Sequence, residues 1–211
     1  MEMKKILCFV LTLIFLVNLV PVYAAEPEEI PINEENFPDE IFRGTITEKF
    51  DKNTDGKLDK AEASEVTRID VSNKVVTDLT GLKYFSELQE LFCSNNQLTG
   101  LDVSKNTKLT NLYCDQNKLT ALNLKNNTKL KVLSCNDNQL KTLDLSTNGN
   151  LHGLMCQNSQ LEEVTFCQNP SIGSMYLDDN HLSSLNLEGN HLNEGEKLEI
   201  RWFPSRFRLD R

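Results

Sequence analysis

Several kinds of pattern are missing from this sequence of 211 residues, and each absence excludes a class of function. Beyond residue 24 no apolar stretch is long enough to span a membrane. No nucleophile elbow, Walker loop or zinc motif occurs, and no cysteine or serine motif accompanies the three histidines, His152, His181 and His191. We therefore expect no enzymatic activity from this chain.

Basic residues are also scarce. Lys and Arg number 22 against 31 Asp and Glu, for a net charge of −9 at pH 7. Nucleic acids and anionic lipids are bound by basic faces, so the composition argues against both as partners. Cations and basic partners fit the acidic balance better.

The first 24 residues have the pattern of a secretory signal peptide. Lys4 and Lys5 precede an apolar stretch over 6–20 that is short for a membrane span, and small residues around Ala24 suit cleavage. The alternative is an uncleaved membrane anchor. We expect cleavage, a mature chain with no transmembrane span, and a secreted or cell-surface location.

A period of 21 residues dominates the rest of the chain. In rows that begin at Leu88, apolar residues fill positions 1, 4, 6, 11, 14 and 16, and asparagine recurs at positions 9 and 19. An earlier row of 22 residues begins at Val66, so one 22-residue row and five 21-residue rows cover 66–192. Position 1 is occupied in turn by Val66, Leu88, Leu109, Leu130, Leu151 and Ile172.

The pattern L-x-x-L-x-C-x-x-N-x-L resembles the leucine-rich-repeat family, and within it the internalin-like class of bacterial surface proteins. The resemblance implies an α/β repeat solenoid, a horseshoe with parallel strands on its concave face. Each row would contribute one short strand at positions 3–5. No row can bury its apolar face alone, so stability would be the sum of contacts between neighbouring rows.

Position 6 carries cysteine in four rows, which raises three possibilities: a disulfide framework, a metal site or core packing. The residues are Cys93, Cys114, Cys135 and Cys156, whereas Val71 and Leu177 hold the same position in other rows. A thiol that alternates with Val and Leu behaves as a small hydrophobe, and a straight ladder provides no tetrahedral zinc site. We expect a buried cysteine ladder. Cys167, outside the ladder, is the thiol expected to react.

The segment FDKNTDGKLDKAE, residues 50–62, resembles an EF-hand or dockerin-like calcium loop. The resemblance implies a small helical cap at 38–65 that calcium stabilises, with Gly56 at the sharp turn. The implied calcium ligands are Asp51, Asn53, Asp55, Lys57 through its carbonyl, Asp59 and Glu62.

Two segments fit neither the repeat nor the loop. Residues 25–37 are acidic and contain proline, which predicts a linker. The tail at 193–211 departs from the row pattern, because Asn193 and Glu196 would hold positions 1 and 4. This tail is either a capping segment or the product of a reading frame that changes or ends there.

Position 5 should point outward from the strands and form a stripe that borders acids and amides at positions 7 and 8. Aromatic residues are enriched at interface hot spots, although such residues also simply suit exposed strands. The candidate partner-binding residues are Phe92, Tyr113, Asp115, Asp137, Met155, Tyr176 and Asp178, with Ser134 interrupting the stripe.

Together these patterns predict a secreted or cell-surface binding module whose concave face holds an extracellular protein or glycan. The alternative is that the chain is the N-terminal part of a longer surface protein, with an anchor or catalytic domain elsewhere. The sequence identifies no ligand.

Overall fold

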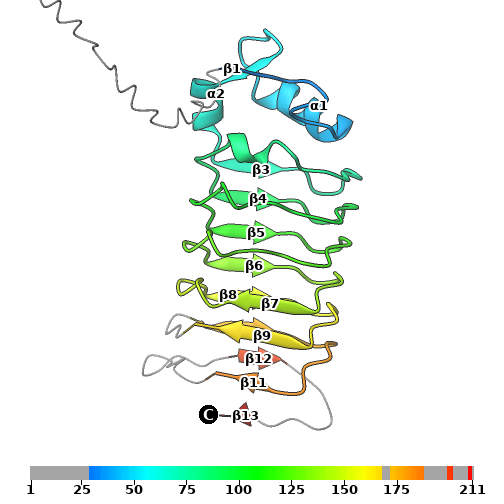
Figure 1. Cartoon of the computed structure of the whole chain (residues 1–211), viewed down its shortest axis with the longest axis vertical. Helices are drawn as coiled ribbons and strands as arrows, with labels where there is room; N and C mark the ends of the chain where they lie inside the picture. Colours follow the sequence, from blue (N-terminus) through cyan, green and yellow to red (C-terminus); the bar gives the residue numbers. More distant parts are fainter. Residues whose placement is uncertain (1–28, 168–171, 188–198, 202–208, 211) are drawn as a thin grey trace, which may run out of the picture.

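The computed structural model describes residues 29–167, 172–187, 199–201 and 209–210, the last two ranges through their backbone. They form a β-solenoid in which parallel strands stack row upon row, with two short helices at one end (Figure 1). The expected signal peptide at 1–24 lies outside the described residues.

One parallel sheet runs along the whole stack. Its seven strands follow the order β12-β10-β8-β6-β5-β4-β3. The register pairs equivalent row positions, so that Leu91 lies opposite Ile69 and Leu112. The strands are β3 (Arg68–Asp70), β4 (Glu90–Phe92), β5 (Asn111–Tyr113), β6 (Val132–Ser134), β8 (Gly153–Met155), β10 (Ser174–Tyr176) and β12 (Glu199–Arg201). The strands expected at positions 3–5 are thus confirmed.

The opposite side of the solenoid is paired only in its later rows. There β7 (Thr142–Leu145) pairs with β9 (Glu163–Phe166), and β11 (Leu185–Asn186) pairs with β13 (Leu209–Asp210), both in parallel. The equivalent segments 78–81, 100–103 and 121–124 are not strands. The two sides therefore differ, with a continuous sheet on one and a partly open surface on the other.

The core is a set of apolar columns along the solenoid. Position 4 is completely buried in successive rows, at Ile69, Leu91, Leu112, Leu133 and Leu154. Burial of one such side chain contributes about 1.5–3 kcal/mol, and each is buried by the rows on either side. The columns are therefore what holds one row to the next.

Asparagine at position 9 bonds the turn that follows each strand, as the sequence predicts. The Asn117 amide donates to the carbonyl oxygens of Cys93 and Cys114, each at 3.0 Å, and its Oδ1 accepts the Leu98 N–H at 3.0 Å. The side chain thus connects its own row to the one before. Ser159 holds this position in one row and donates to the Cys135 carbonyl oxygen at 2.9 Å.

A second column of asparagines, at position 19, lies on the other side of the core. Asn106, Asn127 and Asn148 are at most 1% exposed. Each donates from Nδ2 to two backbone carbonyls, as Asn127 does to Val103 and Asn106. Both ends of each turn are therefore fixed by buried amides.

The cap consists of β1 (Glu29–Pro31), α1 (Glu40–Lys49), β2 (Lys57–Asp59) and α2 (Lys60–Glu65). β1 pairs with β2 in antiparallel register, with Ile30 opposite Leu58. Phe37 is completely buried. Residues 29–37, expected in the acidic linker, are therefore part of the cap, because the strand segment Lys57–Asp59 needs a backbone partner and Phe37 an apolar site.

The cap is attached to the first row by side chains that contact residues about 40 positions later. Asp39 caps α1 by accepting the Phe42 N–H at 2.9 Å, and its other oxygen accepts the Thr77 N–H at 2.8 Å. At the other end of the same segment, Gly81 has φ +109°, and a Cβ there would lie 2.4 Å from the Phe37 ring. The short 3-10 helix η1 (Leu82–Tyr84) follows Gly81. Cap and solenoid thus share one core.

The tail does not leave the repeat where the 21-residue frame breaks down. β12 pairs in register with β10, with Glu199 opposite Ser174. These two residues are 25 positions apart (199 − 174), four more than in the regular rows. Because this connection is longer, a search at a fixed period of 21 residues does not find the next strand. The expectation that the repeats end near residue 192 is therefore corrected, since β12 adds a further strand to the sheet.

Candidate functional site

The outward face of the seven-stranded sheet, which we call the sheet face, carries the expected stripe. Phe92, Tyr113, Ser134, Met155 and Tyr176 are register partners on β4, β5, β6, β8 and β10. All but Ser134 are partly exposed, whereas Ser134 is buried. The fold therefore brings side chains from positions 92 to 176 into one column.

Two aromatic rings at the cap end of the stripe stack on each other. The Phe92 and Tyr113 ring centroids are 4.7 Å apart with an interplanar angle of 10°. Such pairs contribute about 0.5–1.5 kcal/mol beyond the area they bury, and here they fix both rings in place. The stack is a rigid surface, which lowers the entropic cost of binding against it.

Arg68, which the sequence did not single out, completes this stack. Its guanidinium carbon lies 3.9 Å from the Phe92 ring centroid, while Nη1 bonds Glu90 at 2.9 Å and Nη2 bonds Asp70 at 3.4 Å. The positive charge is thus neutralised by two neighbouring acids. The sequence did carry a signal for this contact. Arg68 lies opposite Glu90 and diagonal to Phe92 on the next strand, and long side chains reach diagonal neighbours on adjacent strands.

Asp115 is the centre of a hydrogen-bond network rather than a free acid. Its two oxygens accept from Ser94 Oγ at 3.0 Å, Ser134 Oγ at 2.5 Å, Asn136 N at 2.9 Å and Asn136 Nδ2 at 2.8 Å. The carboxylate therefore holds three rows together at the edge of the sheet face.

The two other expected acids lie along the same edge. Asp137 is exposed, has φ +53°, and accepts from Asn158 Nδ2 at 2.7 Å. Asp178 accepts from Gln157 Nε2 at 2.9 Å, and its Oδ1 is buried with no partner among the described residues. Positive φ recurs at position 8 of all six rows, at Asn73, Asn95, Gln116, Asp137, Asn158 and Asp179. The edge is therefore a repeated tight turn that presents acids and amides.

The expected calcium loop is closed by hydrogen bonds to its own backbone. Asp51 accepts the N–H groups of Asp55 and Gly56 at 3.1 and 3.0 Å. Glu62 accepts those of Lys52 at 2.7 Å and Asp59 at 3.0 Å. Gly56 has φ +78°, which fits the sharp turn that the resemblance assigns to it.

The residue types in this loop are those that bind calcium, but their side chains do not converge on one point. Asp51 and Glu62 are each 6% exposed, and burial of two carboxylates calls for a cation. Asn53 and Asp55 are exposed, and Asp59 is the N-cap of α2. Over the described ranges no group of three or more His, Cys, Asp or Glu is arranged to hold a metal ion. The residues fit calcium in kind, and an ion would have to draw them closer together.

The four cysteines form a buried ladder, as the sequence indicates. Cys93, Cys114, Cys135 and Cys156 are completely buried free thiols, and the Cys135 and Cys156 sulfur atoms lie 2.7 Å apart. Burial raises the pKa of Cys93, Cys114 and Cys135 far above the usual value of a thiol. Thiols held in this neutral form are unreactive. Cys167 is partly exposed.

Comparison with other proteins agrees with the repeat pattern. No family model matches the chain. A stretch of 71 residues is 34% identical to Internalin J of Listeria monocytogenes serotype 4b, which is 34% of this chain and 8% of that protein. The same protein of serovar 1/2a is 35% identical over 71 residues. The match thus spans a small part of these relatives.

Solved structures show the same fold over a longer range. The functional domain of Internalin J from Listeria monocytogenes, described as including a cysteine ladder, aligns with 86% of this chain and 48% of that chain at 24% identity and a TM-score of 0.56. Internalin C2 of strain 4b F2365 aligns with 83% of this chain and 98% of that chain at 18% identity and a TM-score of 0.55. The chain therefore has the leucine-rich-repeat fold seen in these internalins.

Among the residues that the structure describes, neither α-helix has the length and apolar character needed to span a bilayer.

Proposed function

We propose that this chain is a secreted or cell-surface binding module that holds an extracellular protein or glycan on its sheet face. The observation that carries this proposal is the in-register column from Phe92 to Tyr176, in which the first two rings are stacked and held by Arg68. Rigid, partly exposed aromatics are the side chains that contribute most at interfaces.

The charges beside the column favour a partner with basic groups. Asp137 and Asp179 are exposed at position 8, Asp178 lies next to them, and Arg68 is neutralised by Glu90. An acidic edge accelerates the encounter with a basic partner and repels acidic ones. Binding should therefore weaken as salt concentration rises.

The test begins with binding of the native protein to an array of extracellular proteins and glycans. The partner found is then titrated with Tyr113→Ala, Met155→Ala and the control Thr120→Ala, an exposed residue outside the sheet face. Tyr113→Ala is expected to weaken binding at least about tenfold and Met155→Ala to weaken it to a smaller extent, while the control leaves it unchanged. Equal affinity for all three variants would show that another surface binds.

A second candidate function places the repeats in a longer protein that also has other domains, and one specific observation supports it. The matching stretch is 8% of Internalin J, so related repeats do occur within a much longer chain. In that case the module would direct an anchor or catalytic domain to a surface, with no enzymatic activity of its own. Sequencing of the gene beyond the stop codon in all three frames, and fractionation of culture and cells, would distinguish a released module from a retained one.

We also propose that the loop at 51–62 binds calcium and thereby stabilises the cap. Support comes from the full set of expected oxygen donors and from the two buried carboxylates, Asp51 and Glu62. Thermal unfolding of the native protein is compared in calcium, in magnesium and in chelator. Calcium should raise the melting temperature of the native protein but not of Glu62→Gln, and Glu48→Gln on α1 serves as the control. No calcium-dependent shift in the native protein would reject the proposal.

A further inference from the structure

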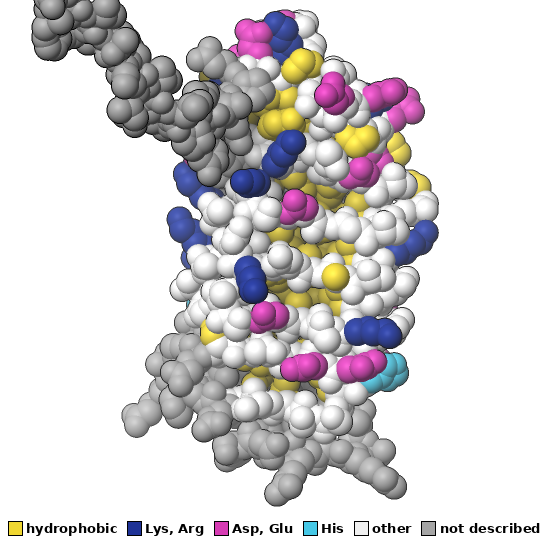
Figure 2. Space-filling view, in the orientation of Figure 1, with side chains coloured by type: hydrophobic (Ala, Val, Ile, Leu, Met, Phe, Trp, Pro, Cys, Tyr) yellow, Lys and Arg dark blue, Asp and Glu magenta, His cyan; other side chains and the backbone are white. Residues whose placement is uncertain are grey.

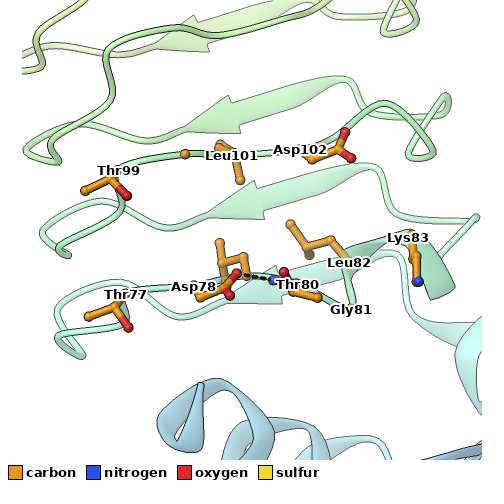
Figure 3. A pocket seen from close by; sticks show the side chains of 11 residues that line it. Thr77, Asp78, Thr80, Gly81, Leu82, Lys83, Thr99, Leu101 and Asp102 are labelled. Carbon is orange, nitrogen blue, oxygen red and sulfur yellow. Dashed lines mark hydrogen bonds between the residues drawn. The ribbon is translucent and has the colours of Figure 1, made fainter. Parts of the chain in front are cut away.

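A groove crosses the side of the solenoid opposite the sheet face, between the first and second rows. Its volume is about 640 Å³, and it is lined by segments 77–83 and 99–102 (Figure 3). β7 and β9 lie on this side, toward the viewer in Figures 1 and 2, and apolar side chains are visible down its centre between polar ones. The groove and the aromatic column therefore lie on opposite sides of the solenoid.

The groove exists because the two rows do not pair here. In later rows β7 and β9 form a parallel ladder from Thr142 opposite Glu163 to Leu145 opposite Phe166. By contrast, no backbone hydrogen bond joins 77–80 to 99–102 in this fully described region. The first row, with 22 residues, is also one residue longer than the four rows that follow it, and its chain turns into η1 after Gly81, where the Phe37 ring fills the space that a side chain would need. Backbone and side-chain polar groups thus face an open space.

The lining combines many hydroxyl and carboxylate groups with a limited apolar floor. Thr77 and Thr99 lie at one end, whereas Lys83 and Asp102 lie toward the other, and Leu101 lies between the two (Figure 3). Asp78 and Asp102 each use Oδ1 to accept a nearby backbone N–H, from Thr80 at 2.7 Å and from Ser104 at 2.9 Å. These bonds fix the carboxylates in place, and each retains a second oxygen as an acceptor.

We propose that this groove binds a short saccharide of one or two sugar units. Ligand sites usually occupy about 300–1,000 Å³, so the volume suits a molecule of this size. Carboxylates and threonine hydroxyls at fixed positions bond neighbouring hydroxyl groups of a sugar, and Leu101 offers an apolar contact for its C–H face. The ring of Tyr84 lies beneath the Lys83 ammonium, at 4.9 Å, which holds this donor at the rim.

Other ligand classes fit this lining less well. An apolar molecule would cover the second carboxylate oxygens of Asp78 and Asp102 without forming a hydrogen bond to them. An anion would meet two carboxylates and a single lysine. A metal ion lacks a site here, since no suitable cluster of acids occurs among the described residues. A neutral ligand rich in hydroxyl groups would supply donors to the free carboxylate oxygens and acceptors to the Lys83 ammonium.

The chain provides matched controls for the test. Asp144 holds the position of Asp102 two rows later and accepts the Ser146 N–H at 3.0 Å, beside a smaller hollow of about 260 Å³. Asn123 holds the same position between them and accepts the Lys125 N–H at 3.2 Å, so asparagine preserves this turn. Gly100 lines the groove, and a Cβ there would have no atom within 4 Å, so a side chain can be introduced at this position.

The experiment is saturation-transfer NMR on the native protein with maltose, cellobiose and N,N′-diacetylchitobiose at millimolar concentrations. At least one disaccharide should receive saturation. Gly100→Phe should abolish the signal and Asp102→Asn should weaken binding about tenfold, whereas Asp144→Asn should leave it unchanged. Circular dichroism confirms that each variant is folded. The proposal is wrong if no sugar of the set receives saturation, if Gly100→Phe binds as the native protein does, or if both Asp→Asn variants weaken binding equally.

Discussion

Replacement of Asn117 by alanine should lower the free energy of unfolding by about 2–4 kcal/mol. The side chain is 8% exposed and makes bonds to four backbone groups. Three of those groups keep another partner after the change. The Cys93 carbonyl still accepts from Asn96, the Cys114 carbonyl from Asn138, and the Asp115 carbonyl from Asn95 N.

The fourth group, the Leu98 N–H, is left buried without a partner. That alone costs about 1–3 kcal/mol, and the three weakened carbonyls add a further fraction. For a chain of this size the total corresponds to a decrease in melting temperature of about 5–15 °C. Asn117→Ser keeps a donor but removes the amide carbonyl. Its free energy of unfolding should therefore lie between those of the parent and the alanine variant.

Urea and thermal unfolding measure these losses, and amide exchange at Leu98 reports them locally. Exchange at Leu98 should accelerate in Asn117→Ala more than exchange at residues in distant rows. Thr120→Ala is the control, because Thr120 is exposed and its substitution should change stability by less than about 0.5 kcal/mol. If Asn117→Ala unfolds at the same urea concentration as Thr120→Ala, the asparagine does not couple the rows.

Three further changes test the cap and the ladder. Gly81→Ala should destabilise by at least about 2 kcal/mol in urea unfolding, because φ is +109° and the new Cβ would meet Phe37, whereas Gly44→Ala in α1 should stabilise slightly; equal effects would contradict this. Burial tends to raise the pKa of Asp39, but bonds from the Thr77 and Phe42 N–H groups lower it overall. The ionised Asp39 carboxylate therefore stabilises the fold at neutral pH, and this stabilisation is lost as pH falls below the ordinary pKa of 3.8. In urea unfolding between pH 5 and 3, the native protein should lose more stability than Asp39→Ala. Parallel losses in the two proteins would refute this. A thiol reagent should label Cys167 in the folded protein and the four ladder cysteines only after unfolding, as read by mass spectrometry, and early labelling of Cys114 would show that the ladder opens.

The sequence predicts the part of the fold that depends on one row and its neighbours. Position 4 leucines and position 9 asparagines repeat at a fixed interval, and their roles follow from equivalent positions stacking on one another. The strands at positions 3–5 therefore lie where the pattern places them, from Arg68–Asp70 to Ser174–Tyr176. These strands can be predicted from the repeat alone, without knowledge of contacts between residues distant in the sequence.

Contacts that break the period could not be predicted. The pairing of Ile30 with Leu58 and of Asp39 with Thr77 depends on how the cap folds back on the first row. β12 begins after four additional residues, so a frame of 21 misses it. The network around Asp115 depends on which small polar residues face it from neighbouring rows, since the same carboxylate beside apolar neighbours would be free to bind a partner.

The position 9 asparagines give the solenoid a direction. The N–H at position 11 of one row is accepted by the asparagine of the following row, as in Leu98 with Asn117 and Leu119 with Asn138. A row is therefore completed only when its successor has been added. A chain that emerges N-terminal end first can fold as it appears, each new turn closing the one before it on the template of the cap. The order of synthesis and the order of assembly are then the same.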